Sequence, residues 1–344
     1  MQSLLDPAIL FFVLGVFAGA VKSSLEIPPA ISKFLSLYLL MALGLKGGFE
    51  LAHAGLSTDV MLCVGAAMLM AFVVPALGYA VLRNRVSKFD AAAVAAAYGS
   101  VSAVTFLTAM QYLEGQGIQP GGHMAVAMVL MESPAILMAV VLANALRAQA
   151  MVQASRCGVA GGPGGTLVMG SGAGGAPAGH ISIKQVLHES FTDGAQVLLL
   201  GSLVVGFLTG DEGKAVMAPF STNLFKGMLA FFLLDMGLKV AQHFPQARQN
   251  SGWLIAYAVV APVVHAALAL GLATVLGLSV GDAALLMVLS ASASYIVVPA
   301  VLRDAMPEAN PALYFGLSLG ITFPLNLILG IPAYTWVARQ VLSG

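Results

Sequence analysis

Residues 90–113 read DAAAVAAAYGSVSAVTFLTAMQYL, and residues 282–302 read DAALLMVLSASASYIVVPAVL. Each stretch opens with an aspartate and two alanines, continues as an apolar run, and carries a cluster of serines near its middle. A helix needs about 20 residues to cross the hydrocarbon core of a bilayer. We therefore predict two membrane spans of the same unusual kind, and we expect Asp90 and Asp282 to cap them.

The serine clusters predict that both helices are broken near the bilayer midplane. Glycine beside β-branched residues, or a proline after several serines, favours an unwound helix centre. Unwinding at that depth is tolerated around a polar cavity, and a half-helix N-terminus offers N–H groups that bind anions. The alternative is that the serines are small residues that allow tight packing. We favour a substrate site, and its predicted residues are Gly99, Ser100, Ser102, Thr105, Ser292, Ser294 and Tyr295.

The composition of the whole chain places it in a membrane. Of its 344 residues, 59% are hydrophobic and 9% are charged, against roughly 25% charged in a typical soluble domain. Lipid must therefore solvate much of the surface. The net charge is zero, and no basic face suits nucleic acid. The two cysteines, Cys63 and Cys157, form neither a disulfide framework nor a zinc motif.

Apolar runs predict ten membrane spans, and basic residues orient them. With both termini outside a plasma (inner) membrane, eleven basic residues fall on the cytoplasmic side and four on the outer side, as the positive-inside rule requires. The expected spans centre on residues 7–22, 30–51, 59–82, 90–113, 123–147, 185–209, 221–243, 252–276, 282–302 and 311–337.

The chain also shows an internal repeat. The motif LGLK at 43–46 returns as MGLK at 236–239, and the aspartate–alanine starts and serine clusters recur at offsets of 192 residues. Pro134 corresponds to Pro324, at an offset of 190, so the features recur in the same order at nearly constant spacing. Because each half has five expected spans, an odd number, the second half enters the membrane from the opposite face. Inverted repeats are typical of secondary transporters. We expect repeats at 1–149 and 185–344, joined by a glycine-rich cytoplasmic linker at 150–184.

Two acidic residues fall inside the expected spans and are candidates for a coupling-ion site. A carboxylate within the membrane is costly and is a functional candidate by default. Glu132 lies next to Pro134, whose distortion of the helix could turn the carboxylate toward a cavity. Asp235 lies four residues before Lys239, so a simple ion pair is an equal alternative. For His265 we favour a packing role over a proton relay.

At these motifs the sequence resembles the sodium-dependent bicarbonate transporter (SbtA-like) permeases. The segments that carry the resemblance are 99–102 (GSVS), 132–135 (ESPA), 141–144 (VLAN), 292–294 (SAS), 302–303 (LR) and 307–311 (PEANP). The resemblance implies a core and a gate domain, a homotrimer, and sodium-coupled bicarbonate uptake by an elevator-like motion. It also implies regulation by a cytoplasmic PII-like protein. Relative to family members, Tyr295 replaces an acidic residue, and Val104, Val297 and Val298 replace small or hydroxyl residues.

Other functions remain open at this point. A carrier for another small anion or weak acid could couple to protons through Glu132. An intramembrane enzyme is disfavoured, because the sequence contains neither H-E-x-x-H nor G-x-S-x-G. A channel would need a continuous polar stripe along several helices, whereas the polar residues here form one patch near the midplane. A membrane scaffold is the remaining alternative. We therefore expect a transporter with no enzymatic activity and no cofactor other than a coupling Na+.

Overall fold

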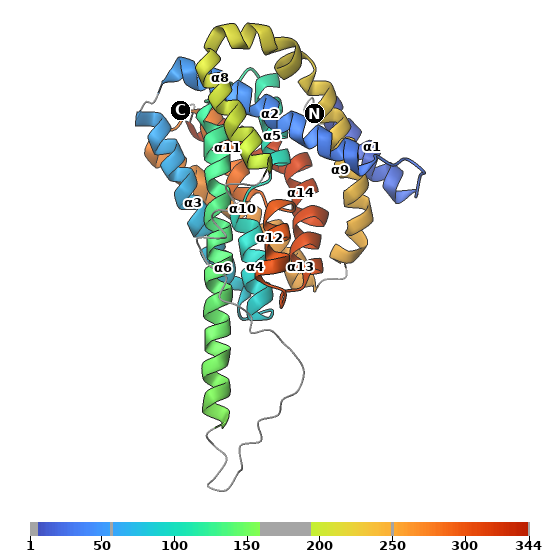
Figure 1. Ribbon diagram of the computed structural model, residues 1–344, viewed down its shortest axis with the longest axis vertical. Helices are drawn as coiled ribbons and strands as arrows, with labels where there is room; N and C mark the ends of the chain where they lie inside the picture. Colours follow the sequence, from blue (N-terminus) through green and yellow to red (C-terminus); the bar gives the residue numbers. More distant parts are fainter. Residues whose placement is uncertain (1–5, 56–57, 159–193, 249–250, 343–344) are drawn as a thin grey trace.

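The computed structural model describes residues 6–55, 58–158, 194–248 and 251–342, and these segments are helical with short connections (Figure 1). Within these ranges, six helical segments are long and apolar enough to cross a membrane. Two further helices, Pro7–Ala20 and Val280–Ala291, are apolar but shorter. The chain is therefore a multi-pass helical membrane protein. The six segments are Pro29–His53, Val60–Leu82, Lys88–Gly115, His123–Ala148, Gly252–Leu276 and Pro311–Leu342.

The helices of the first half follow the expected spans, and the fourth span is divided into two helices as predicted. One difference is that the fifth span continues to Gly158, past the expected start of the linker at residue 150. Residues 147–157 are mostly Ala, Gln, Met and Arg, which favour a helix and explain this extension (Figure 1). The elements are α1 (Pro7–Ala20), α2 (Pro29–Ala54), α3 (Thr58–Leu82), α4 (Lys88–Gly99), α5 (Ala103–Gly115) and α6 (His123–Gly158).

The second half is more irregular than the sequence indicated. The expected span at 185–209 corresponds to a helix that continues to Ala218 through a kink at Gly210, and its first residues, 185–193, lie outside the described ranges. The expected last span, 311–337, contains two π-helical turns. The elements are α8 (Gly194–Ala218), η2 (Pro219–Asn223), α9 (Phe225–Arg248), α10 (Gly252–Leu276), α11 (Val280–Ala291), α12 (Val297–Ala305), α13 (Pro311–Leu317), η3 (Ser318–Thr322), α14 (Phe323–Leu325), η4 (Asn326–Gly330) and α15 (Ile331–Leu342).

Glycines bring helices of the two halves into close contact. α1 packs along α9, and α2 packs along α8. A Cβ atom on Gly237 of α9 would lie 2.2 Å from the Phe12 carbonyl oxygen of α1, and one on Gly44 of α2 would lie 2.4 Å from the Leu199 carbonyl oxygen of α8. Small residues are the usual means of such close approach in membranes. Gly44 and Gly237 belong to the two copies of the LGLK-like motif, so the motif marks a packing site.

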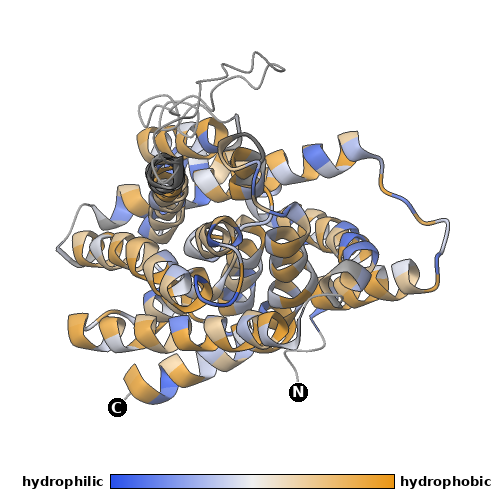
Figure 2. Ribbon diagram, turned by 90° about the horizontal axis from the view of Figure 1, so that it is seen from below, coloured by the Kyte–Doolittle hydropathy of each residue, from blue (hydrophilic) through white to orange (hydrophobic). Residues whose placement is uncertain are grey.

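The remaining helices form a second group around the two helices with serine clusters. α3 packs against α4 and α6, and α10 packs against α11. α4 and α11 are almost completely buried, whereas α10 exposes apolar side chains such as Val260 and Val275, the latter 84% exposed. Figure 2 shows that hydrophobic residues predominate along most helices, and many large apolar side chains of the described residues are exposed. Such a surface is stable against lipid and would be unfavourable against water.

Candidate functional site

Both serine clusters interrupt a helix, as the sequence predicted. α4 ends at Gly99, Ser100 is extended, and α5 starts at Ala103 with Ser102 as its N-cap. α11 ends at Ala291, Ser292 is extended, and α12 starts at Val297. The depth of these breaks in a bilayer remains a prediction, because the structure contains no membrane.

The two interruptions contact each other through hydrogen bonds between the halves of the chain. The backbone N–H of Ser294 donates to the carbonyl oxygen of Ala97 over 2.8 Å. The backbone N–H of Ser102 donates to Oγ of Ser292 over 3.0 Å, and that hydroxyl donates in turn to the carbonyl oxygen of Leu289. These groups are buried, so each bond satisfies a backbone group that unwinding left without a helical partner.

Serine hydroxyls also stabilise the start of the helix that follows each break. Ser102 Oγ accepts hydrogen bonds from the Thr105 backbone N–H, over 3.2 Å, and from the Thr105 hydroxyl, over 2.9 Å. Ser294 Oγ accepts from the backbone N–H of Val298 over 3.3 Å. The N-termini of α5 and α12 are therefore brought to one place. A helix N-terminus carries about half a positive elementary charge, so this place favours a negatively charged ligand.

A cavity of about 80 Å³ lies at the two helix starts. One water molecule needs about 10–15 Å³ measured in this way, so the cavity has room for a small anion with few waters. Its wall combines the serine clusters with three other helices, α2, α6 and α8. The lining residues are Ser36, Leu40, Val101, Ser102, Ala103, Val104, Met128, Val129, Glu132, Gln196, Leu199, Ser294, Tyr295 and Ile296.

Glu132 lines this cavity together with a residue that sequence reasoning missed. The side-chain amide of Gln196 donates a hydrogen bond to Glu132 Oε2 and thereby connects α8 to α6. Gln196 is 3% exposed. A single amide side chain in an otherwise apolar helical stretch could have marked Gln196 as a site residue. Its partner lies 64 residues away in the sequence, so the pairing could not be derived from spacing.

The other predicted site residues surround the cavity without lining it. Gly99 allows close packing on α3, since a Cβ atom there would lie 2.6 Å from the Pro75 side chain. Ser100 is 1% exposed, and its hydroxyl has no hydrogen-bond partner among the described residues. Thr105 and Ser292 serve as the hydrogen-bonding partners of Ser102.

Asp235 lies apart from this site. Its Oδ2 accepts hydrogen bonds from the Ser32 hydroxyl, over 2.5 Å, and from Lys239 Nζ, over 2.7 Å. It is absent from the cavity lining given above. The structure therefore favours the ion-pair interpretation of Asp235 over its assignment to a coupling-ion site, because the lysine one helical turn away on α9 already neutralises the carboxylate.

The helix caps correct one expectation and reveal a matching pair. Ser87 and Ser279, not Asp90 and Asp282, are the N-caps of α4 and α11. Each serine hydroxyl accepts from the backbone N–H of the aspartate three residues later and donates to its Oδ2. The other carboxylate oxygen, Oδ1, bonds elsewhere: that of Asp90 accepts a hydrogen bond from Asn310 N–H over 2.7 Å, and that of Asp282 accepts one from Gly121 N–H over 2.8 Å. Each aspartate therefore anchors a loop of the opposite half.

Apolar helices, two hydrogen-bonded helix interruptions and a small cavity at their helix starts define a multi-pass membrane protein with an internal cavity. The family model for the Na+-dependent bicarbonate transporter superfamily matches residues 7–339, so the chain belongs to that superfamily. This match confirms the resemblance drawn from the serine clusters and the ESPA segment. No curated protein sequence matches the chain.

Proposed function

We propose that this protein is a secondary active transporter that takes up bicarbonate together with Na+. The observation that carries the proposal is the meeting of the α5 and α12 N-termini at one small cavity. Two termini of about +0.5 charge each complement roughly one negative charge. The hydroxyls of Ser102, Ser294 and Tyr295 are at the same wall and can replace part of an anion's water shell.

The position of the cavity supports alternating access by an elevator-like motion. Ser36, Leu40 and Gln196 come from the α2–α8 group, whereas the serine clusters and Glu132 come from the other group of helices. We assign the first group, with α1 and α9, as the gate domain and the second as the core domain. A substrate held between two bodies can reach either side when one slides against the other.

The paired caps support two inverted five-helix repeats, at 1–149 and 185–344, joined by the linker at 150–184. Ser87 with Asp90 and Ser279 with Asp282 form the same hydrogen bonds at the start of equivalent helices. The ten-span topology, with both termini outside the plasma membrane, belongs to this proposal. Its homotrimeric state and a PII-like cytoplasmic regulator rest on the family resemblance.

A proton-coupled carrier of another small anion is the second candidate. The observation that favours it is the position of Glu132 in the cavity wall, where a carboxyl group can take up and release a proton beside the anion. Protonation could then offset the cost of a charge at that depth. In the sodium-coupled model, a bound cation neutralises the same carboxylate.

The test is uptake of labelled bicarbonate into proteoliposomes with and without an inward Na+ gradient. We expect accumulation that depends on Na+. Accumulation driven by a pH gradient alone would favour the second candidate. If neither gradient drives uptake of bicarbonate or of a panel of other monovalent and divalent anions, the transporter assignment is wrong.

A further inference from the structure

A second and larger cavity, of about 450 Å³, lies beside the first. α2 contributes Leu40 to the substrate cavity and Leu43 to the second one. α6 likewise contributes Met128 to the first and Ala125 to the second. Three residues along a helix correspond to about 4.5 Å of rise. The two cavities are therefore consecutive along the same pair of helices.

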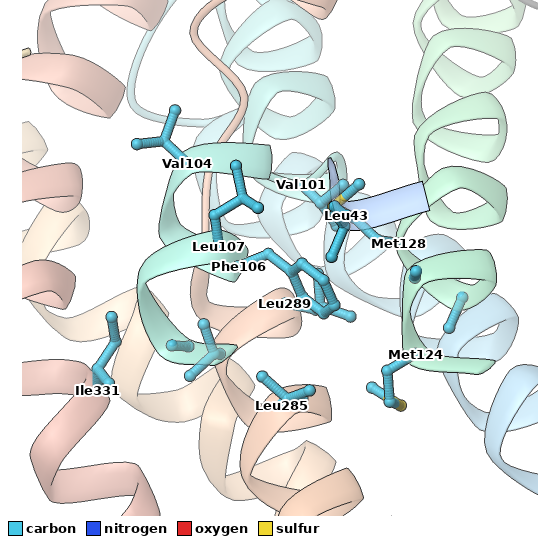
Figure 3. Packing of buried hydrophobic residues seen from close by; sticks show 14 of the residues in the cluster. Leu43, Val101, Val104, Phe106, Leu107, Met124, Met128, Leu285, Leu289 and Ile331 are labelled. Carbon is cyan, nitrogen blue, oxygen red and sulfur yellow. The ribbon is translucent and has the colours of Figure 1, made fainter. Parts of the chain in front are cut away.

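Apolar side chains separate the two cavities. Leu43, Val101 and Met128 belong to one packed core cluster and gather between α2, α5 and α6 (Figure 3). Leu43 is 2% exposed and Met128 is 3% exposed. Passage of an anion from the larger cavity to Ser102 and Ser294 along this direction would require these side chains to separate.

The larger cavity carries an excess of positive charge. Three lysines line it together with two glutamates. Lys46 pairs with Glu114 at 3.1 Å, and Lys214 pairs with Glu50 at 3.0 Å. Lys226 has no carboxylate within ion-pair distance among the described residues. The two pairs cancel, so one uncompensated ammonium group remains, at the start of α9.

The Lys46–Glu114 pair also crosses between the two groups of helices, since Lys46 is on α2 and Glu114 is on α5. Its ammonium group lies 4.7 Å from the centre of the Phe225 ring, so an aromatic face would keep stabilising it if Glu114 moved away. The lysine can therefore exchange one anionic partner for another without becoming isolated.

From these contacts we propose that the lysine-lined cavity is an entry vestibule that binds small anions weakly and supplies them to the substrate cavity. Lys226 attracts the anion electrostatically, and Lys46 is the second residue that binds it. The role of the vestibule in supplying anions rests on the proposed transport function. The positive potential in the cavity can be measured without transport. A cleft with an excess of one sign of charge raises the local concentration of the opposite ion.

The first experiment measures that potential directly. Thr222 lines the cavity and is exposed, so Thr222→Cys in a Cys63→Ala, Cys157→Ala background can be modified by thiol reagents. We expect an anionic methanethiosulfonate to react faster than a cationic one of similar size. Lys226→Gln should lower this ratio by about two- to fivefold, which corresponds to the usual strength of an exposed charge interaction. Bicarbonate should slow the anionic reagent.

The matched control is Lys33→Gln, which removes the same charge from an exposed lysine near the other end of α2. Lys33 does not line the cavity, so its removal should leave the ratio unchanged. An equal ratio in the Lys226→Gln and parent proteins would overturn the proposal, whether or not the protein transports bicarbonate.

The second experiment measures uptake. Lys226→Gln should raise KM for the anion by about two- to fivefold at low salt with kcat retained, and Lys226→Glu should raise it further. The difference should shrink at high salt because mobile ions screen the charge. If KM in Lys226→Gln and Lys226→Glu equals KM in Lys33→Gln and Lys33→Glu respectively, the vestibule proposal is refuted. Absence of any anion uptake in the unmutated protein would refute the proposed function instead.

Discussion

Ser102 and Ser292 are joined by a hydrogen bond of 3.0 Å from the backbone N–H of the first to the hydroxyl of the second. The bond connects two helix interruptions that lie 190 residues apart in the chain. Together with the bond from Ser294 N–H to the Ala97 carbonyl oxygen, it holds the starts of α5 and α12 at one cavity. The predictions below begin from this arrangement.

Ser102→Ala and Ser294→Ala should each weaken anion transport. Loss of a hydrogen bond to a charged ligand costs about 1.5–3 kcal/mol, or roughly ten- to a hundredfold in affinity. The loss of binding free energy in the double variant should be smaller than the sum of the losses in the two single variants, because both hydroxyls face one ligand. Ser102 also caps α5, and Ser294 also accepts a hydrogen bond from the first turn of α12. Ser87→Ala is therefore the matched control, because it removes a helix cap outside the cavity. Wild-type uptake kinetics in both single variants would return the serines to a packing role.

Replacement of Glu132 separates the two coupling models. If Na+ is the coupling ion, Glu132→Gln should abolish the Na+ dependence of uptake, and Glu132→Asp should retain part of it. If protons are coupled, wild-type uptake should be independent of Na+ and rise as pH falls, and Glu132→Gln should remove that response. Gln196→Leu, which leaves the carboxylate in place, should change KM while keeping the coupling ion. Unchanged Na+ and pH dependence in Glu132→Gln would show that Glu132 has a structural role.

Asp235→Asn should lower stability and leave the Na+ dependence of transport unchanged. The carboxylate accepts from Ser32 and Lys239, and hydrogen bonds to charged groups contribute about 1.5–3 kcal/mol. The double variant Asp235→Asn, Lys239→Met should be less destabilised than the sum of the two single variants, because neither charge then remains without its partner. Thermal unfolding in detergent measures this coupling. A lost Na+ response in Asp235→Asn would restore its assignment as a coupling-ion residue.

The Arg147–Glu308 pair should make stability depend on pH. Arg147 donates two hydrogen bonds of 2.8 Å to the Glu308 carboxylate, which lower the pKa of Glu308 below its usual value. A carboxyl with a lowered pKa in the folded state stabilises above its unfolded pKa, and the contribution disappears as pH falls through the folded value. Glu308→Gln should therefore reduce Tm at pH 7 by an amount worth about 0.2–1 kcal/mol, and the difference from wild type should vanish in acid. Glu26→Gln, at an exposed position, is the control; a deficit that persists in acid would contradict this role.

The proposed topology predicts which positions are accessible from outside. Cysteines at Ser3 and Ser343 in a cysteine-free background should react with an impermeant thiol reagent added to intact cells, and one at Ser171 should not. All three positions lie outside the described residues. The expectation follows from the basic residues that gather on one side of the predicted spans. The reverse labelling pattern would invert the orientation.

Much of the fold follows from local sequence. Uninterrupted apolar runs require helices in lipid, because each backbone polar group must find a partner within its own segment. The breaks at Ser100–Ser102 and Ser292–Ser294 were likewise predictable, since glycine, β-branched residues, proline and serine weaken a helix locally. The family resemblance came from the same segments.

The composition of the site was decided by packing between distant helices. Gln196 meets Glu132 from α8, and Asp235 is paired with Lys239 and Ser32 instead of facing the cavity. Lys46, Lys214 and Lys226 share one cavity although they come from three separate helices. Periodicity reports which residues can share a face of one helix, but it carries no information on which face of another helix will meet it. The sequence alone therefore determined the apolar helices and their interruptions, and the tertiary structure alone decided which polar side chains meet between them, because those meetings depend on close approach at residues such as Gly44 and Gly237.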